Sequence, residues 1–214
     1  MSPHRRVLVP LWAGWMGFFA ALTAIMCALA LREEISVWLG TSLAALFGIV
    51  IVMLLAPREI QMRLRLSRTW FALSLAMGIA MVVATHALYA LAACVLPGLA
   101  PRVFALYQNL HDPPGPDAAL PVLLVVVLAE ELVFRGLLIA LLERREFGRA
   151  ALIALGTAFY VMPQLASGSW VLIGLAAVCG MLWTWQRLAS GSISAPFITH
   201  VLWDSLIFVG WPLV

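Results

Sequence analysis

The sequence predicts an all-α fold, a polytopic membrane bundle of about seven transmembrane helices. Hydrophobic residues make up 64% of the 214 residues and charged residues 11%, a balance that soluble globular domains do not have. The apolar residues also gather in runs of the length that crosses a bilayer, about 20 residues. No polar stretch between these runs is long enough to fold outside the membrane, so we expect residues 1–214 to form a single membrane domain.

The predicted spans follow one another between breaks of charge, proline or glycine. They cover residues 7–31, 35–56, 70–96, 119–142, 150–165, 170–186 and 194–212. The first three spans and the loop after them make an N-terminal part, residues 1–118, and the other spans make a core, residues 119–214. Only Ser167, Gly168 and Ser169 separate the fifth and sixth spans, which therefore form either a tight hairpin or one broken helix.

Two features mark the predicted membrane surfaces. The longest non-membrane stretch, residues 97–117, contains Pro113, Pro114 and Pro116, so we expect an external loop or cap there rather than a regular helix. Several tryptophans lie near span ends or within the late spans, and interfacial anchoring accounts for most of them. These are Trp170, Trp183, Trp185, Trp203 and Trp211.

The arginines predict the orientation of the chain, because cytoplasmic loops hold the excess of basic residues. All 13 basic residues are arginines, and Arg135 lies inside the fourth span. One predicted side receives Arg5, Arg6, Arg58, Arg63, Arg65, Arg68, Arg144, Arg145, Arg149 and Arg187, and the other receives Arg32 and Arg102. We therefore expect a cytoplasmic N-terminus and an external C-terminus. The positive charge needs no nucleic-acid partner to explain it.

The fourth span carries three ionisable residues near its middle, Glu130, Glu131 and Arg135. An ionisable group at mid-span costs about 2.5–3.5 kcal/mol on insertion scales, so a cluster of them indicates a function. Glu131 and Arg135 are four residues apart on one helical face, in the favoured order for an ion pair. Glu130 points about 100° away from that face and lacks this cation. We therefore assign Glu131 and Arg135 a supporting role and Glu130 the role of a general acid or base.

The last span carries a second polar pair, His200 and Asp204, also four residues apart. Such a pair can orient a water or stabilise a developing oxyanion. It can equally be an internal hydrogen bond that joins helices, which is common in membrane bundles. Two helices that bring polar groups to a similar depth favour a shared site. Neither helix has the spacing of a zinc site such as His-Glu-x-x-His, so we expect no metal and no other cofactor.

These residues resemble the motifs of the CAAX protease and bacteriocin-processing family of intramembrane glutamic endopeptidases, also called the Abi family. Its first motif, Glu-Glu-x-x-x-Arg in a Phe-Arg-Gly context, is matched by residues 130–136. Its last motif, His-x-x-x-Asn or His-x-x-x-Asp, is matched by His200 and Asp204. The resemblance covers roughly residues 120–210. It implies that Glu130 activates a water for attack on a peptide carbonyl, while His200, with Asp204 behind it, stabilises the oxyanion.

The middle motif of that family, Phe-x-x-x-His, differs in this sequence. Counting from Phe159 places Pro163 at the histidine position, and counting from Tyr160 places Gln164 there. Neither side chain can accept and shuttle a proton as imidazole does. We therefore expect Gln164 to hold the water by hydrogen bonding and Glu130 to act as the sole base.

The predicted function is an intramembrane endopeptidase, a metal-independent hydrolase. A site enclosed by lipid implies a membrane-tethered substrate, such as a C-terminal transmembrane sorting tail, a leader peptide or a lipidated tail. Bacterial members of the family act in protein sorting and bacteriocin maturation, and by this analogy we expect a location in the inner membrane of a bacterium. The sequence leaves the oligomeric state open.

Two other functions fit the same residues. A catalytically inactive family member would bind membrane peptides as an immunity or scaffold protein, and the absent histidine of the middle motif favours it. A proton-coupled transporter would use intramembrane Glu, His and Asp as a proton relay. It would require an inverted repeat, which the sequence does not display.

Overall fold

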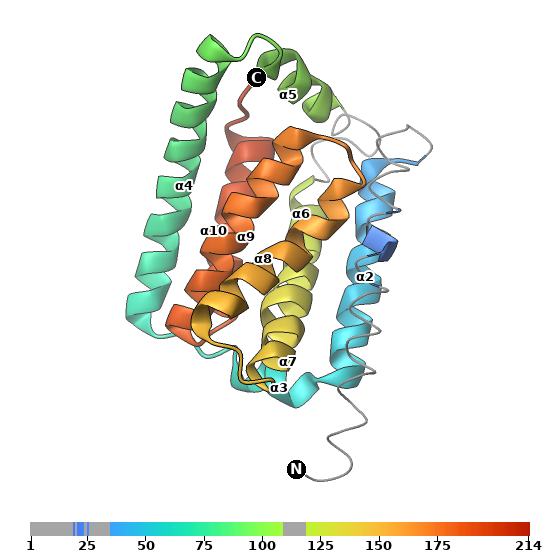
Figure 1. Ribbon diagram of the computed structural model, residues 1–214, viewed down its shortest axis with the longest axis vertical. Coiled ribbons are helices and arrows are strands. Elements are labelled where there is room, and N and C mark those ends of the chain that lie inside the picture. The colour runs from blue at the N-terminus through green and yellow to red at the C-terminus, as the bar shows by residue number, and fades with distance from the viewer. Residues whose placement is uncertain (1–18, 20, 24, 26–34, 109–118) are drawn as a thin grey trace.

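A computed structural model of the chain describes residues 35–108 and 119–214, together with Phe19, residues 21–23 and Ile25. Within these ranges the chain is helical and contains no β-strand, as expected (Figure 1). Most of the first predicted span, residues 7–31, lies outside the described residues, and so do Pro113, Pro114 and Pro116.

The other six predicted spans all coincide with helical segments. These are α2 (Val37–Leu55), α4 (Arg68–Val95), a central helix made of α6 (Ala119–Glu130), η3 (Glu131–Leu138) and α7 (Ile139–Glu143), then α8 (Arg149–Leu165), α9 (Trp170–Ser190), and α10 (Ser194–Ser205) with η4 (Leu206–Gly210). Among the described residues, three helices are long and apolar enough by themselves to cross a membrane: Trp38–Leu55, Arg68–Val95 and Trp170–Ser190. The other helices are shorter or carry ionisable residues, so the expected count of about seven transmembrane helices stays a prediction.

The stretch after α4 differs from the expected loop. Residues Leu99–Gln108 form helix α5, which buries Leu99, Val103 and Tyr107. These residues are spaced four apart, so they share one helical face and give α5 an apolar side. The prolines at 113–116 do not prevent this helix because they lie beyond its end. A short helix, α3 (Pro57–Met62), was not expected either.

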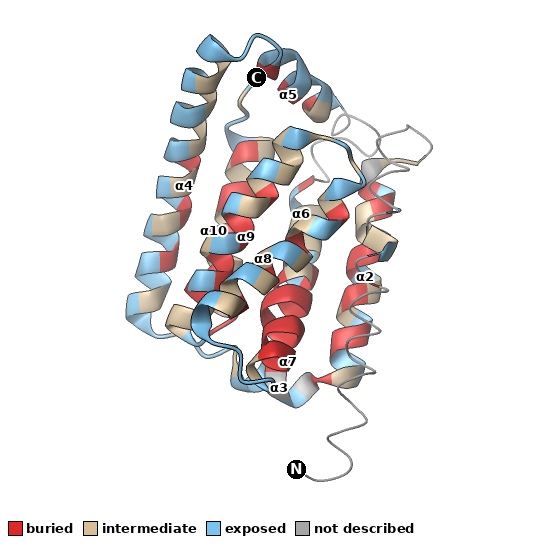
Figure 2. Cartoon of the chain, viewed as in Figure 1, coloured by how far each residue is buried: buried red, intermediate tan, exposed pale blue. Residues whose placement is uncertain are grey.

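The central helix lies in the interior of the bundle. It packs against α2, α8, α9 and α10, and every residue from Glu131 to Leu142 is buried. Figure 2 shows this stretch as a continuous buried helix beneath α8. Residues 131–138 adopt the wider π-helical winding, which is rare and frequently found at functional sites.

Helices α8 and α9 form the tight hairpin that was one of the two expected arrangements, joined by residues 166–169 (Figure 1). Glycines at the contact allow the close approach. A Cβ on Gly180 of α9 would lie 3.0 Å from Cδ1 of Tyr160 on α8, and one on Gly156 would lie 3.0 Å from Thr184 on α9. Small residues at such contacts are typical of membrane helix pairs.

The two ends of the bundle differ in charge. At one end, α3 lies beside α7 (Figure 1). Arg63, directly after α3, forms an ion pair of 2.7 Å with Glu143, the last residue of α7. The α9–α10 turn joins them there, since the backbone N–H of Ile193 donates to the carbonyl of Arg63. The arginines of these segments therefore gather at this end, whereas Arg102 lies on α5 at the other end.

A neutral polar cluster ties α4 to α9 and α10. The side-chain amide of Gln186 donates to the hydroxyls of Ser74, at 3.0 Å, and Thr199, at 2.8 Å. Thr199 in turn donates to the carbonyl of Ser74, and all three residues are fully buried. We call these three residues the neutral cluster.

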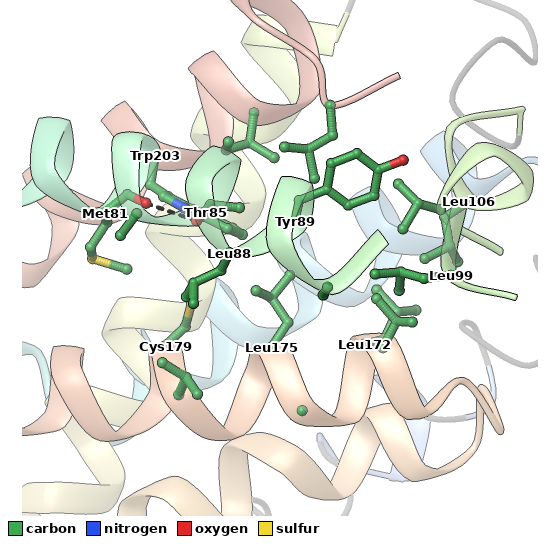
Figure 3. A pocket seen from close by; sticks show the side chains of 18 of the residues that line it. Met81, Thr85, Leu88, Tyr89, Leu99, Leu106, Leu172, Leu175, Cys179 and Trp203 are labelled. Carbon is green, nitrogen blue, oxygen red and sulfur yellow. Dashed lines mark hydrogen bonds between the residues drawn. The ribbon is translucent and has the colours of Figure 1, made fainter. Parts of the chain in front are cut away.

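A wide apolar cavity of about 390 Å³ opens between α4, α5, α9 and α10. Figure 3 shows Leu88 of α4, Leu99 of α5 and Leu175 of α9 among the side chains around it. The dashed line in the figure marks the hydrogen bond that the indole N–H of Trp203 donates to the hydroxyl of Thr85, at 3.0 Å. Apart from the hydroxyls of Thr85, Tyr89 and Tyr107, the side chains around this cavity are almost all apolar.

Candidate active site

The first part of the candidate site is a row of three buried ionisable side chains. Oε1 of Glu131 lies 3.2 Å from Nη1 of Arg135 and 2.9 Å from Nδ1 of His200. The first distance confirms the ion pair expected from the four-residue spacing. The bond to His200 was not expected. Since an ionised carboxylate only accepts hydrogen bonds, Nδ1 of His200 carries the proton that is shared with Glu131.

The guanidinium of Arg135 is also enclosed by aromatic rings. Its Cζ lies 4.2 Å from the ring centroid of Tyr160 and 5.3 Å from that of Trp183. Cation–π contacts of this kind strengthen where water is excluded. A further arginine, Arg187, donates from Nε to the carbonyl of Arg135 at 3.2 Å, which anchors the π-helical stretch.

The second part of the site surrounds Glu130. Its Oε2 accepts a hydrogen bond of 2.8 Å from the hydroxyl of Tyr160 and lies 3.8 Å from Nε2 of His200. The Glu130 side chain is 21% exposed, whereas that of Glu131 is completely buried. The two adjacent carboxylates therefore face different surroundings, as their spacing predicted, and His200 bridges them with its two ring nitrogens.

A small cavity adjoins Glu130. It has a volume of about 70 Å³, and its lining includes Glu130, Tyr160, Pro163 and Gln164. A cavity needs about 10–15 Å³ to hold one water, so this one has room for several. It provides the site with space for water next to a carboxylate.

Asp204 and Trp183 complete the surroundings of His200. Oδ1 of Asp204 lies 3.6 Å from Nε2 of the imidazole, on the same side as Glu130. The indole of Trp183 stacks on the imidazole, with ring centroids 3.5 Å apart and an interplanar angle of 22°. His200 is thus held on one face by an aromatic ring and at Nδ1 by the hydrogen bond with Glu131, while Nε2 lies within 4 Å of the carboxylates of Glu130 and Asp204.

The structure brings Glu130, Glu131, Arg135, His200 and Asp204 into one connected group. Gln164 lies in the lining of the same cavity as Glu130, and no hydrogen bond joins their side chains. Pro163 has no N–H, so the carbonyl of Phe159 lacks its usual helical donor near the cavity.

Sequence reasoning missed Tyr160 and Trp183 as site residues. The pattern of an apolar helix does not distinguish an aromatic residue that faces a polar site from one that faces lipid. Trp183 is 1% exposed and Trp203 is 3% exposed, so interfacial anchoring does not explain the positions of these two tryptophans. Trp170, Trp185 and Trp211 are exposed, in agreement with that interpretation.

This arrangement has the components of a hydrolytic site. Glu130 offers a carboxylate beside a water-sized space, and His200 offers a ring nitrogen within 4 Å of it. Within the described part of the chain, no group of three or more His, Cys, Asp or Glu residues is arranged to hold a metal ion.

Comparison with known proteins identifies one family. Residues 117–206 match the family model described as Rce1-like, type II CAAX prenyl endopeptidase. Neither a curated protein nor a solved structure matches the chain significantly. The matched segment runs from the start of the central helix to the end of α10 and so contains every residue of the candidate site. The resemblance inferred from the motifs is confirmed, because residues 117–206 match the model of the Rce1-like family of CAAX prenyl endopeptidases.

Proposed function

We propose that this chain is a glutamic-type intramembrane endopeptidase that cleaves membrane-tethered peptides or protein tails. The observation that carries the proposal is the 3.8 Å approach of Glu130 Oε2 to His200 Nε2 at the edge of a cavity large enough for water. The match of residues 117–206 to a protease family supports the same reaction class.

In the proposed reaction, the carboxylate of Glu130 takes a proton from a water in the cavity. The water oxygen forms a bond to the carbonyl carbon of the substrate, and the carbonyl electrons move onto its oxygen. When this intermediate collapses, the C–N bond breaks and the proton held by Glu130 passes to the leaving nitrogen. The products are a carboxylic acid and an amine, and no other reactant is consumed.

His200 stabilises the oxyanion from Nε2 in this proposal. Because its Nδ1–H is shared with Glu131, the ring donates from Nε2 when it is the doubly protonated imidazolium. Asp204, 3.6 Å from Nε2, orients that N–H. Arg135 and Glu131 hold the imidazole in place, and Gln164 positions the water from the far side of the cavity.

The surroundings of the site favour a substrate that is itself in the membrane. The central helix lies among apolar helices, three of which are long enough to span a bilayer. The arginine-rich end of the bundle supports a cytoplasmic location for α3 and the α7–α8 connection, as the positive-inside rule predicts. We further propose that the protein is located in a bacterial inner membrane.

The test uses purified protein in proteoliposomes and three quenched fluorescent reporters. One carries a prenylated C-terminal Cys-aliphatic-aliphatic-X tail, one is a lipid-anchored leader peptide, and one continues into a C-terminal transmembrane helix. We expect cleavage of at least one reporter by the wild type, and activity that survives dialysis against EDTA. Glu130→Gln should lower turnover by roughly 10²–10⁴-fold, because the base is lost.

The matched control is Glu146→Gln, which removes an exposed carboxylate at the α7–α8 connection and should keep wild-type turnover. The proposal is overturned if the wild type cleaves none of the three reporters, or if Glu130→Gln cleaves as fast as the wild type.

An inactive peptide-binding protein is the second candidate, and the occupation of the family's histidine position by Pro163 favours it. The same reporters separate the two functions. A binding protein would retain the reporters in the proteoliposomes without cleaving them, and Glu130→Gln would leave this retention unchanged.

A further inference from the structure

We infer that Tyr160 is a positioning residue for the Glu130 carboxylate, a function that the sequence motifs assign to no residue of this chain. The inference rests on the proposed function, because it requires Glu130 to be the base. It also accounts for how α8 serves the site without the histidine of the middle motif.

The geometry at Glu130 carries the first step. The Tyr160 hydroxyl donates to Oε2 at 2.8 Å, and the same oxygen is the one nearest to Nε2 of His200. Among the described residues, the other oxygen, Oε1, has no hydrogen-bond partner. A carboxylate held at one oxygen has a defined orientation, and its second oxygen remains available to accept the proton of a water.

The ring of Tyr160 is itself held firmly, which makes the position of its hydroxyl definite. The ring of Phe134 packs edge-on at 5.3 Å and that of Trp183 at 5.9 Å, while the guanidinium of Arg135 covers one face. These three residues belong to the central helix and to α9. Tyr160 therefore connects the packing of three helices to a single carboxylate oxygen.

A comparison with the other buried tyrosine shows that this contact differs from an ordinary structural one. The hydroxyl of Tyr107 donates to the backbone carbonyl of Ile207, at 2.6 Å, and so joins α5 to η4. The hydroxyl of Tyr160 instead donates to an ionisable side chain in the lining of a cavity. No proton passes through Tyr160: the proton moves from water to Oε1 of Glu130 and then to the leaving nitrogen.

The kinetic test compares Tyr160→Phe with Tyr107→Phe on the reporter that the wild type cleaves. Tyr160→Phe keeps the ring and its aromatic contacts but frees the carboxylate, so we expect kcat to fall roughly ten- to hundredfold with KM within twofold. Tyr107→Phe also removes a buried hydroxyl, and we expect it to lower the thermal midpoint while kcat stays within twofold of the wild type.

An infrared measurement provides a readout that needs no substrate. The carboxylate band of Glu130 is identified by its disappearance in Glu130→Gln. We expect this band to shift in Tyr160→Phe, because a hydrogen bond to the carboxylate is lost, and to stay in place in Tyr107→Phe. A structural role for Tyr160 would not move it.

The outcomes separate the two proposals. An inactive Glu130→Gln together with a Tyr160→Phe protein of wild-type kcat, or an unshifted Glu130 band, overturns the positioning role and leaves the proposed function standing. A Glu130→Gln protein as active as the wild type overturns both.

Discussion

Among the described residues, the neutral cluster and the site around Glu130 are both buried groups of polar side chains, and they differ in what surrounds them. The neutral cluster of Ser74, Gln186 and Thr199 contains no charged side chain, and none of its residues lines the cavity beside Glu130. The site around Glu130 contains five ionisable groups, aromatic rings and a cavity of about 70 Å³. The hydrogen bonds of the neutral cluster run between α4, α9 and α10 and so join these helices. The charged group instead places a carboxylate beside a cavity with room for water.

Loss of the ion pair between Glu131 and Arg135 should affect the protein more than any other single substitution at the site. Glu131→Gln removes the carboxylate that pairs with Arg135 and accepts from His200, and both partners stay buried. Removing one partner of a buried pair costs about 3–5 kcal/mol. We expect a large fall in the thermal midpoint in detergent, and turnover below detection in the fraction that remains folded.

The control for this prediction is Arg63→Gln, which breaks the ion pair with Glu143 and leaves the contact of Glu143 with the buried Arg187 in place. That pair is screened by solvent, because its side chains are 26% and 30% exposed. We expect a loss of up to about 1 kcal/mol and retained turnover. A Glu131→Gln protein as stable and active as Arg63→Gln would show that the buried pair does not support the site.

Two glutamines allow a further comparison: Gln186 belongs to the neutral cluster, and Gln164 lines the cavity beside Glu130. Gln186→Leu removes two hydrogen bonds from the neutral cluster and should cost about 1–3 kcal/mol, with kcat unchanged. Gln164→Leu alters the cavity lining, so we expect little change in stability and a severalfold fall in kcat. Thermal midpoints and reporter kinetics of both variants show whether each substitution affects stability or turnover. Wild-type kcat in Gln164→Leu would exclude this residue from positioning the water.

The helices and the local ion pair could be predicted from the sequence, because both depend on neighbours along the chain. The span expected at residues 35–56 is α2 (Val37–Leu55), and the pair of Glu131 with Arg135 follows from a four-residue spacing. Motif resemblance indicated His200 as a partner in the same site, and the structure places its Nδ1 2.9 Å from Oε1 of Glu131.

What the sequence did not indicate depends on contacts between helices. The bond of His200 to Glu131 and that of Tyr160 to Glu130 join residues 69 and 30 positions apart. Which residue of an apolar helix faces a polar neighbour depends on helix rotation and packing, which hydropathy does not record. Helix α5 was missed because its apolar side is only three residues, spaced four apart within a proline-containing stretch.

Gly180 allows a test in which only the packing around Tyr160 changes. A Cβ on Gly180 would lie 3.0 Å from Cδ1 of Tyr160, closer than ordinary van der Waals contact, so Gly180→Ala should displace the ring by a few tenths of an ångström. Because the Tyr160 hydroxyl fixes the Glu130 carboxylate, we expect kcat to fall about two- to fivefold, with KM and the folded yield nearly unchanged.

The matched control is Gly174→Ala on the same helix, where an added Cβ meets no atom within 4 Å. It changes the same residue type in α9 without approaching Tyr160, and its kcat should equal that of the wild type. The double variant Gly180→Ala, Tyr160→Phe provides the decisive measurement. If Gly180 acts through the Tyr160 hydroxyl, the effects are not additive, and the double variant is no slower than Tyr160→Phe alone. Fully additive losses would show that Gly180 affects turnover by another route through the α8–α9 contact.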